Sequence, residues 1–168
     1  RLRNEWSARS CARSSSGPVF QNSPAPYRAT SCLPIAAARA GRDGSRDARM
    51  QACVDAVWQA FGSRPYSWIG FYSRAPGDEM ILEKRRDKPA CSPIGLQGMC
   101  GRCWTEATPI LIHDVRVLGA NYIACDPRDL SEIVIPCMNA DGSCWGVLDG
   151  DSYDLAAFDE SDVKGLTM

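Results

Sequence analysis

The chain has 168 residues, of which 45% are apolar and 23% are charged, with a formal net charge of −1. This length and composition are typical of one globular domain with its own core, and the near-neutral charge gives no reason to expect nucleic acid or a membrane surface as a partner. Because no apolar run could span a bilayer and no secretory signal is recognisable, we expect a cytoplasmic protein.

Residues 1–45 form a basic flank rich in Arg, Ser and Pro, with little hydrophobic periodicity. We interpret this flank as a partly ordered segment that packs along an acidic domain over residues 46–168. A transit peptide and a nucleic-acid-binding tail are the alternatives. The Pro-rich stretch at residues 23–26 and the weak amphipathicity argue against the transit peptide.

The first predicted elements are a helix and a β-hairpin. A helix is expected over residues 47–61, where apolar residues recur at helical spacing and Gly62 follows. Residues 67–72 are rich in aromatic and β-branched residues, which favours a strand. A turn at residues 75–78 then connects this strand to a return strand at residues 80–82.

Two long loops are predicted in the middle of the chain. Residues 84–98 form the first, and we interpret its charged run from Lys84 to Lys88 as solvated. A short helix at residues 99–107 and a strand at 109–112 follow. Residues 116–130 form the second loop. Long loops inside a compact domain usually carry function.

The last predicted elements are a second hairpin and a helix. Residues 132–138 and 143–148 are expected to pair around a turn at residues 139–142. Asp159, with Asp162 three residues on, can start the helix. The order of elements predicts an α+β fold, with a central antiparallel sheet, helices on one face and the long loops on the other.

Nine cysteines, an odd and high number, occur at positions 11, 32, 53, 91, 100, 103, 125, 137 and 144. Cys53 lies in a predicted helix, and Cys137 and Cys144 lie in predicted strands, so we expect these to be small buried apolar side chains. Cysteines in loops beside polar residues are better candidates for chemistry. Both long loops carry such cysteines, Cys91 in the first and Cys125 in the second.

Carboxylates cluster in the second hairpin. Glu132 lies in its first strand, and Asp149 and Asp151 follow its second. Because side chains alternate along a strand, Asp149 and Asp151 face the same side. The sequence therefore predicts a pocket that contains several cysteines and several acids.

Six segments carry a resemblance to a known family. In chain order they are WIGFY at 68–72, KPAC at 88–91, GMCG at 98–101, IACD at 123–126, SEIV at 131–134 and GVLDGD at 146–151. Over residues 47–162 the chain resembles the GAF-domain free methionine-(R)-sulfoxide reductases, and six motifs in order are far more specific than one. The resemblance implies a GAF-like catalytic domain at residues 46–168, ending in a short helix.

The resemblance implies roles for three cysteines. Cys125 stands at the nucleophile position and would attack the sulfoxide sulfur, which yields a sulfenic acid. Cys91 stands at the resolving position and would form a disulfide with Cys125. Cys100 matches a third thiol that can take part in relay, and a thioredoxin-like reductant would close the cycle.

The resemblance also implies a substrate site for free methionine-(R)-sulfoxide. Glu132, Asp149 and Asp151 match its carboxylates, which could bind the ammonium group and hydrogen-bond the sulfoxide oxygen. Trp68 and Tyr72 would form an apolar wall. No cofactor and no metal are implied, and family members are often homodimers.

The chain departs from the family pattern at several positions. Cys91 and Cys100 are nine residues apart, one fewer than the family spacing, and residues 82–87 are more charged than usual. Gly150 stands where a β-branched residue is usual, and Cys103 is additional. These departures concern the loop around Cys91 more than Cys125.

Other interpretations stay open at this stage. Cys100 and Cys103 form a C-x-x-C pair, which Cys91 and Cys125 could complete to a four-cysteine zinc site. A GAF-type sensor could use the same pocket without turnover. Such a sensor would not need Cys91 and Cys125 to approach each other. The single histidine, His113, is interpreted as a strand-end residue rather than a ligand or base.

Overall fold

The computed structural model describes residues 44–62, 64–122 and 125–167, and its centre is a six-stranded antiparallel sheet with the strand order β3-β2-β1-β6-β5-β4. The strands are β1 (Trp68–Arg74), β2 (Glu79–Arg86), β3 (Ile94–Gly95), β4 (Ile110–Ile112), β5 (Ser131–Met138) and β6 (Cys144–Ser152). The predicted antiparallel sheet is confirmed. The flank predicted over residues 1–45 lies almost entirely outside the described residues.

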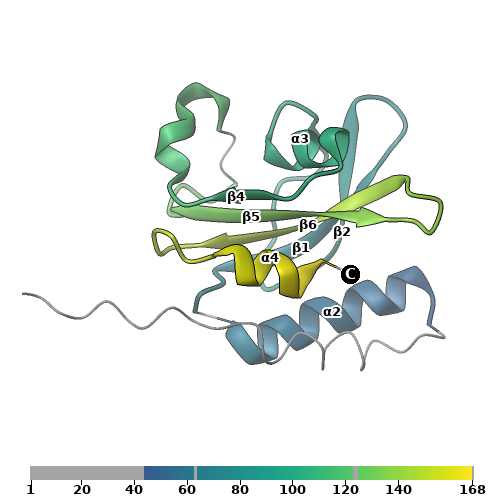
Figure 1. Ribbon diagram of the computed structural model, residues 1–168, viewed down its shortest axis with the longest axis horizontal. Coiled ribbons are helices and arrows are strands. Elements are labelled where there is room, and N and C mark those ends of the chain that lie inside the picture. Colours follow the sequence, from purple (N-terminus) through teal and green to yellow (C-terminus); the bar gives the residue numbers. More distant parts are fainter. Residues whose placement is uncertain (1–43, 63, 123–124, 168) are drawn as a thin grey trace, which may run out of the picture.

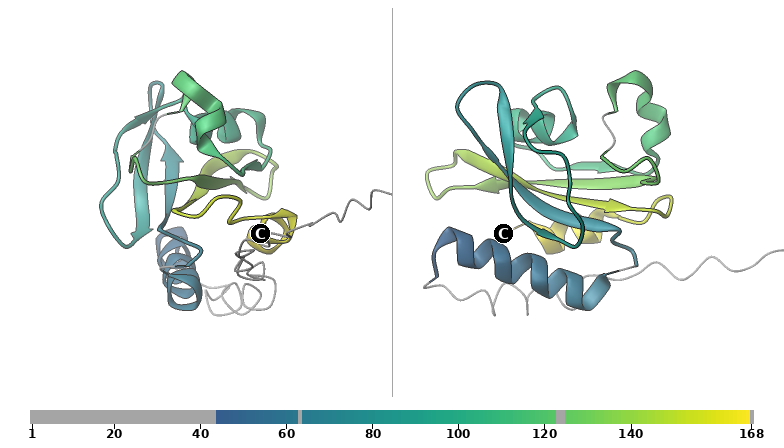
Figure 2. Two further views of the ribbon diagram at one scale, coloured as in Figure 1. Left: turned by 90° about the vertical axis from the view of Figure 1, so that its left-hand side faces the viewer. Right: turned by 180° about the vertical axis from the view of Figure 1, so that it is seen from behind.

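The helices divide between the two faces of the sheet. Helices α2 (Arg46–Phe61) and α4 (Glu160–Leu166) cover one face (Figure 1). Helix α3 (Met99–Glu106) and the 3-10 helix η2 (Val115–Asn121) lie with the long loops on the other, which we call the loop face (Figure 2). The predicted α+β arrangement is thus confirmed, with one short α-helix added to the loop face. Among the described residues, no helix is both long and apolar enough to cross a membrane.

Helix α2 begins and ends where local chemistry predicts. The Ser45 hydroxyl accepts a hydrogen bond from the Ala48 N–H at 3.2 Å, which caps the first turn. Gly62 closes the other end, and its N–H donates to the carbonyl of Trp58. At the C-terminus, the predicted start of α4 is confirmed as a capping box between Asp159 and Asp162.

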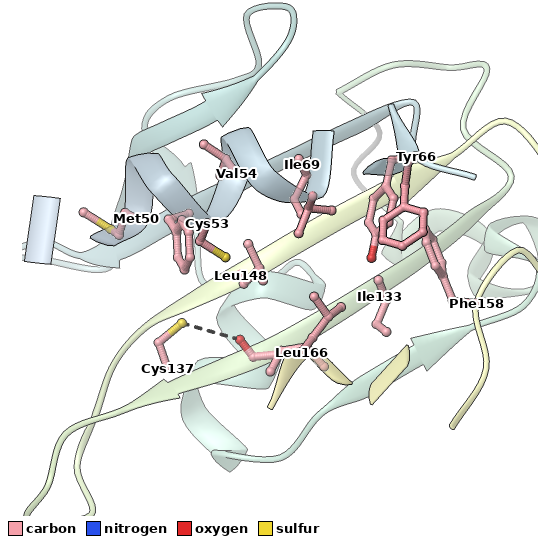
Figure 3. Packing of buried hydrophobic residues seen from close by; sticks show 14 residues of the cluster. Met50, Cys53, Val54, Tyr66, Ile69, Ile133, Cys137, Leu148, Phe158 and Leu166 are labelled. Carbon is pink, nitrogen blue, oxygen red and sulfur yellow. Dashed lines mark hydrogen bonds between the residues drawn. The ribbon is translucent and has the colours of Figure 1, made fainter. Parts of the chain in front are cut away.

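A hydrophobic cluster fills the space between the sheet and helices α2 and α4 (Figure 3). Cys53 and Cys137 are buried members of this cluster, as predicted, and Cys144 is half-buried. On the loop face, Cys103 is fully buried, and its Sγ donates to the carbonyl of Val134 at 3.5 Å. These thiols therefore serve packing.

The charged run that follows Leu82 does not form a solvated loop as predicted. Strand β2 continues to Arg86, which pairs with Ile69 of β1. Lys84 forms a 2.8 Å ion pair with Asp47 of α2, and Arg86 pairs with Asp55 of the same helix. The prediction was wrong because these charges have partners on a helix some thirty residues earlier in the chain.

Strand β6 extends further than predicted and carries two acids into the sheet. Pairing on both sides keeps it extended to Ser152, since Gly70 of β1 pairs with Asp149 and Glu132 of β5 pairs with Asp151. Asp149 and Asp151 therefore lie within the sheet and not beyond its end. Both face the loop side.

Candidate active site

A pocket of about 220 Å³ opens on the loop face of the sheet. Its lining includes seven of the eight predicted site residues: Tyr72, Cys91, Cys100, Cys125, Glu132, Asp149 and Asp151. The eighth, Trp68, lines an adjoining pocket of about 70 Å³, which Cys125 and Asp151 also line. The fold thus brings together residues that are up to 83 positions apart in the chain.

Cys91 and Cys125 meet at the rim of this pocket. Each comes from one of the two long loops, and both are exposed free thiols. The Cys125 thiol lies close enough to Cys91 for the two residues to influence each other's protonation. Loss of solvent around the thiol, and then the nearby Cys91 side chain, raise the pKa of Cys125 to about 12. Cys125 is therefore protonated at neutral pH in the resting site.

Two aromatic side chains of β1 hold the Cys91 loop in place. The Trp68 indole N–H donates to the carbonyl of Lys88 at 3.0 Å, and the Tyr72 hydroxyl donates to the carbonyl of Cys91 at 2.9 Å. Gly70 between them is required, because a Cβ atom there would lie 2.4 Å from the Trp68 ring. The W-x-G-x-Y pattern of β1 therefore holds the loop that carries Cys91.

Carboxyl groups form the buried end of the pocket. Glu132 and Asp149 are 5% and 8% exposed, so neither carboxyl group is solvated at a strand end. One oxygen of each, Oε2 of Glu132 and Oδ1 of Asp149, is buried with no hydrogen-bond partner. These oxygens are available to a ligand, because buried polar atoms are otherwise nearly always paired.

The same burial changes the protonation of the acids. It raises the pKa of Asp149 to about 7. Burial, and then the charge of Asp149, raise the pKa of Glu132 and of Asp151 well above their ordinary values. The cluster therefore holds protons near neutral pH and can donate a hydrogen bond to an oxygen atom of a ligand.

Cys100 lies deeper than the other two predicted thiols. It is the second residue of α3 and is 6% exposed, and its Sγ donates to Oδ2 of Asp149 at 3.3 Å. Gly101 allows this close packing, because a Cβ atom there would lie 2.3 Å from the backbone of Leu96. Burial, and then the charge of Asp149, raise the pKa of Cys100 well above that of a free thiol.

One group of residues in the described part of the chain has the geometry of a metal site. It consists of Cys100, Glu132 and Asp149, whose ligand atoms lie within 4.8 Å of one another. The four-cysteine zinc site that the C-x-x-C pair left open is not formed by the described residues, since Cys103 points to the Val134 carbonyl. His113 is exposed just beyond β4 and does not line the pocket.

Three residues near the pocket were not predicted from sequence. Tyr122 lines the main pocket, and Lys88 and Asp126 line the smaller one. Asp126 caps a turn, accepting from the Arg128 N–H at 3.0 Å, and it also pairs with Lys88. Asp129 is buried and accepts from the Ser67 hydroxyl at 2.7 Å. Lys88 and Asp126 could have been found from the sequence, because they belong to the KPAC and IACD segments that contain Cys91 and Cys125.

The geometry can be compared with known proteins. The X-ray structure of free methionine-R-sulfoxide reductase from Neisseria meningitidis in complex with its substrate is 34% identical, with a TM-score of 0.72. The match covers 80% of this chain and 79% of that one. The chain belongs to the GAF-domain free methionine-(R)-sulfoxide reductase family.

Curated relatives of this reductase family agree with that assignment. The free methionine-R-sulfoxide reductase of Saccharomyces cerevisiae is 34% identical over 115 residues, which cover 66% of this chain and 63% of the relative. GAF domain-containing protein A of Dictyostelium discoideum is 37% identical over 104 residues, covering 61% and 65%. The chain thus spans just under two thirds of the length of these curated relatives. No protein-family model matches it.

Proposed function

We propose that this protein reduces free methionine-(R)-sulfoxide to methionine, using its own thiols. The observation that carries the proposal is the proximity of Cys91 and Cys125, which both line a pocket with a buried acid cluster. A thiol pair can supply two electrons, and protonated acids can bind an oxygen atom. The names of the reductases from Saccharomyces cerevisiae and Neisseria meningitidis support the choice of substrate.

In the first step, the Cys125 sulfur attacks the sulfoxide sulfur. A protonated carboxyl of the acid cluster donates a hydrogen bond to the sulfoxide oxygen, which makes the sulfur more electrophilic. The sulfur–oxygen bond of the substrate breaks, and the oxygen ends on Cys125. Methionine leaves reduced by two electrons, and Cys125 becomes a sulfenic acid. The unpartnered oxygens of Glu132 and Asp149 are available for these contacts and for the substrate ammonium.

In the second step, the Cys91 thiol attacks the sulfenic sulfur of Cys125. A disulfide forms and the oxygen leaves as water. A dithiol reductant of the thioredoxin type then returns both cysteines to thiols by disulfide exchange and is itself oxidised. We assign Cys100 a supporting role, because its thiol is buried and bonded to Asp149 whereas Cys91 is exposed.

The alternative is a GAF-type sensor that binds a ligand in the same pocket without turnover. A sensor has no need for two exposed thiols that approach each other, so the proximity of Cys91 and Cys125 at the pocket favours the enzyme. Homodimer formation stays a prediction from the resemblance, and analytical ultracentrifugation would test it. A cytoplasmic location stays a prediction from the sequence.

The test is an assay of the reduced chain with dithiothreitol and free methionine-(R)-sulfoxide, and methionine is measured. The (S)-epimer and a peptide-bound sulfoxide serve as comparison substrates. We expect turnover of the free (R)-epimer by the wild type, none by C125S, and normal turnover by C144S, a half-buried cysteine outside the pocket. Equal activity of C125S and wild type, or no turnover by either, would exclude the proposal.

A further inference from the structure

An ion pair joins the two loops that carry Cys91 and Cys125. The Lys88 Nζ atom lies 2.5 Å from Oδ2 of Asp126. Lys88 precedes Cys91 by three residues, and Asp126 directly follows Cys125. The side chains are 30% and 13% exposed, so the pair is partly shielded from water. It lines the 70 Å³ pocket that Cys125 also lines.

Further contacts hold this ion pair in one geometry. Arg128 donates to both oxygens of Asp126, at 3.0 and 2.7 Å, and the Tyr153 hydroxyl donates to Oδ2 at 3.0 Å. Lys88 also donates to the Tyr153 hydroxyl and lies 4.8 Å from the centre of its ring. The hydrogen bonds from Arg128 and Lys88 hold the pKa of Asp126 far below its usual range, so the carboxylate stays charged.

The other polar anchors of the Cys91 loop run to the sheet. They are the bonds from Trp68 and Tyr72 and a 3.1 Å bond from the Leu82 N–H to the Ser92 hydroxyl. These hydrogen bonds fix the position of the Cys91 loop relative to β1 and β2, but they do not join this loop to the second loop. In the described part of the chain, the side-chain link between the loops, apart from the thiols themselves, is Lys88 with Asp126.

We propose that the Lys88–Asp126 ion pair is the positioning element that keeps Cys91 within reach of Cys125, so that the disulfide closes promptly after Cys125 is oxidised. The proposal rests on the proposed function in taking a Cys125 sulfenic acid as the intermediate. Lys88 and Asp126 act through loop position and do not react. Their loss slows closure and leaves the oxidation of Cys125 unchanged, because geometry matters most for the thiol–sulfenic acid reaction.

The experiment uses hydrogen peroxide as the oxidant, so its outcome does not depend on whether the chain reduces methionine sulfoxide. Peroxide oxidises the Cys125 thiol to a sulfenic acid and is reduced to water. The Cys91 thiol then displaces a second water and forms the disulfide. Samples of the reduced chain are quenched over time with dimedone, which traps the sulfenic acid, or with N-ethylmaleimide, which traps thiols. Peptide mass mapping follows Cys91 and Cys125 separately.

The variants are K88M, K88R and K84M. Lys84 is the matched control, because it belongs to the same charged run but pairs with Asp47 on α2. We expect K88M to close about fivefold more slowly than the wild type, which is the scale of a partly exposed ion pair. Dimedone adducts at Cys125 should accumulate in K88M. K88R should restore most of the closure rate, and K84M should match the wild type.

Salt provides a second measurement on the unaltered protein. Sodium chloride at 1 M screens a partly exposed ion pair, so it should slow closure in the wild type and have little effect in K88M. A K88M closure rate within twofold of the wild type would overturn the proposal. So would an equal slowing of sulfenic acid formation and closure in K88M, or an equal slowing of closure in K84M.

Discussion

The Cys100 thiol donates a hydrogen bond to Asp149 across 3.3 Å at the buried end of the pocket. Burial raises the pKa of Asp149 to about 7, and this hydrogen bond opposes the rise because it stabilises the charged form. Two residues from α3 and β6 therefore set together the pH at which the proposed acid loses its proton.

This relationship predicts the pH dependence of the reaction. Cys125, with a pKa near 12, gains thiolate as pH rises, while Asp149, with a pKa near 7, loses its proton above that value. If both the thiolate and the protonated acid are needed, kcat/KM rises about tenfold per pH unit up to about pH 7 and then levels off. In C100A the pKa of Asp149 is higher, so the levelling point moves up, by about one unit or less.

The check is a set of pH–rate profiles for wild type, C100A and C100S with dithiothreitol. C100S keeps a hydrogen-bond donor and should retain the wild-type levelling point. A levelling point that is the same in C100A and wild type would show that the hydrogen bond does not tune Asp149.

Asp149 should also limit stability at alkaline pH. Its pKa in the folded chain, about 7, is above the ordinary 3.8, so the fold prefers the neutral form. This group's contribution is complete below its ordinary pKa and is lost as pH rises toward 7. Asp149→Asn cannot ionise but can still accept from Cys100. We expect D149N to be about 1–3 kcal/mol more stable than wild type at pH 8 and nearly equal at pH 4, and to lose most activity.

Urea unfolding at the two pH values measures this difference. Asp78→Asn, at an exposed turn residue, is the control and should leave the free energy of unfolding unchanged at both. A D149N variant that is less stable than wild type at pH 8 would contradict a neutral, buried Asp149.

Cys91 should suppress the reactivity of its partner in the reduced protein. The neighbouring Cys91 side chain contributes to the raised pKa of Cys125. Cys91→Ala removes that thiol, so the pKa of Cys125 falls and more thiolate is present at pH 8. We expect iodoacetamide to alkylate Cys125 about three- to tenfold faster in C91A than in the wild type. Peptide mass mapping measures the alkylation of Cys125 over time.

The alkylation control separates pKa from access. C91S retains a hydroxyl that can hydrogen-bond, so it should lie between wild type and C91A. If the three proteins share one pH dependence of alkylation, greater access to Cys125 and not its pKa explains any faster reaction.

Gly150 and Tyr66 are expected to depend on each other. A Cβ atom at position 150 would lie 2.7 Å from the Tyr66 ring and 3.3 Å from Ile133, so Tyr66 fills the space that a β-branched residue occupies in the family pattern. Gly150→Val should therefore destabilise the fold by about 1–3 kcal/mol through overpacking. Y66L/G150V should recover part of that loss, which denaturant unfolding measures.

The control for this pair is Tyr66→Phe. The Tyr66 hydroxyl is buried with no hydrogen-bond partner, so its removal should leave the free energy of unfolding equal or slightly higher. Additive effects of Y66L and G150V would mean that the ring and the glycine are not coupled.

Local patterns were sufficient where a few neighbouring residues determine the structure. Apolar spacing and Gly62 predicted α2, and Asp159 with Asp162 predicted the start of α4, because each signal acts within a few neighbouring residues. The role proposed for Cys125 also came from its immediate neighbours, through the resemblance. The fold class followed from the order of such elements.

These local patterns could not predict contacts between residues that are far apart in the sequence. Lys84 and Arg86 were predicted to lie in a loop. They belong to a strand, because β2 pairs with β1 and both side chains form ion pairs with α2. Lys88 was predicted to be a solvated charge. It instead binds Asp126, 38 positions later in the chain, and so joins the two loops that carry Cys91 and Cys125.

By itself, the sequence determined the fold class and the family and predicted the residues of the site, because these depend on local spacing and residue type. Only the tertiary structure decided which of them meet. It made Cys91 and Cys125 exposed partners, buried Cys100 against Asp149, and paired Lys88 with Asp126. Burial and through-space contact determine pKa, reach and reactivity, and neither is a property of neighbours in the chain.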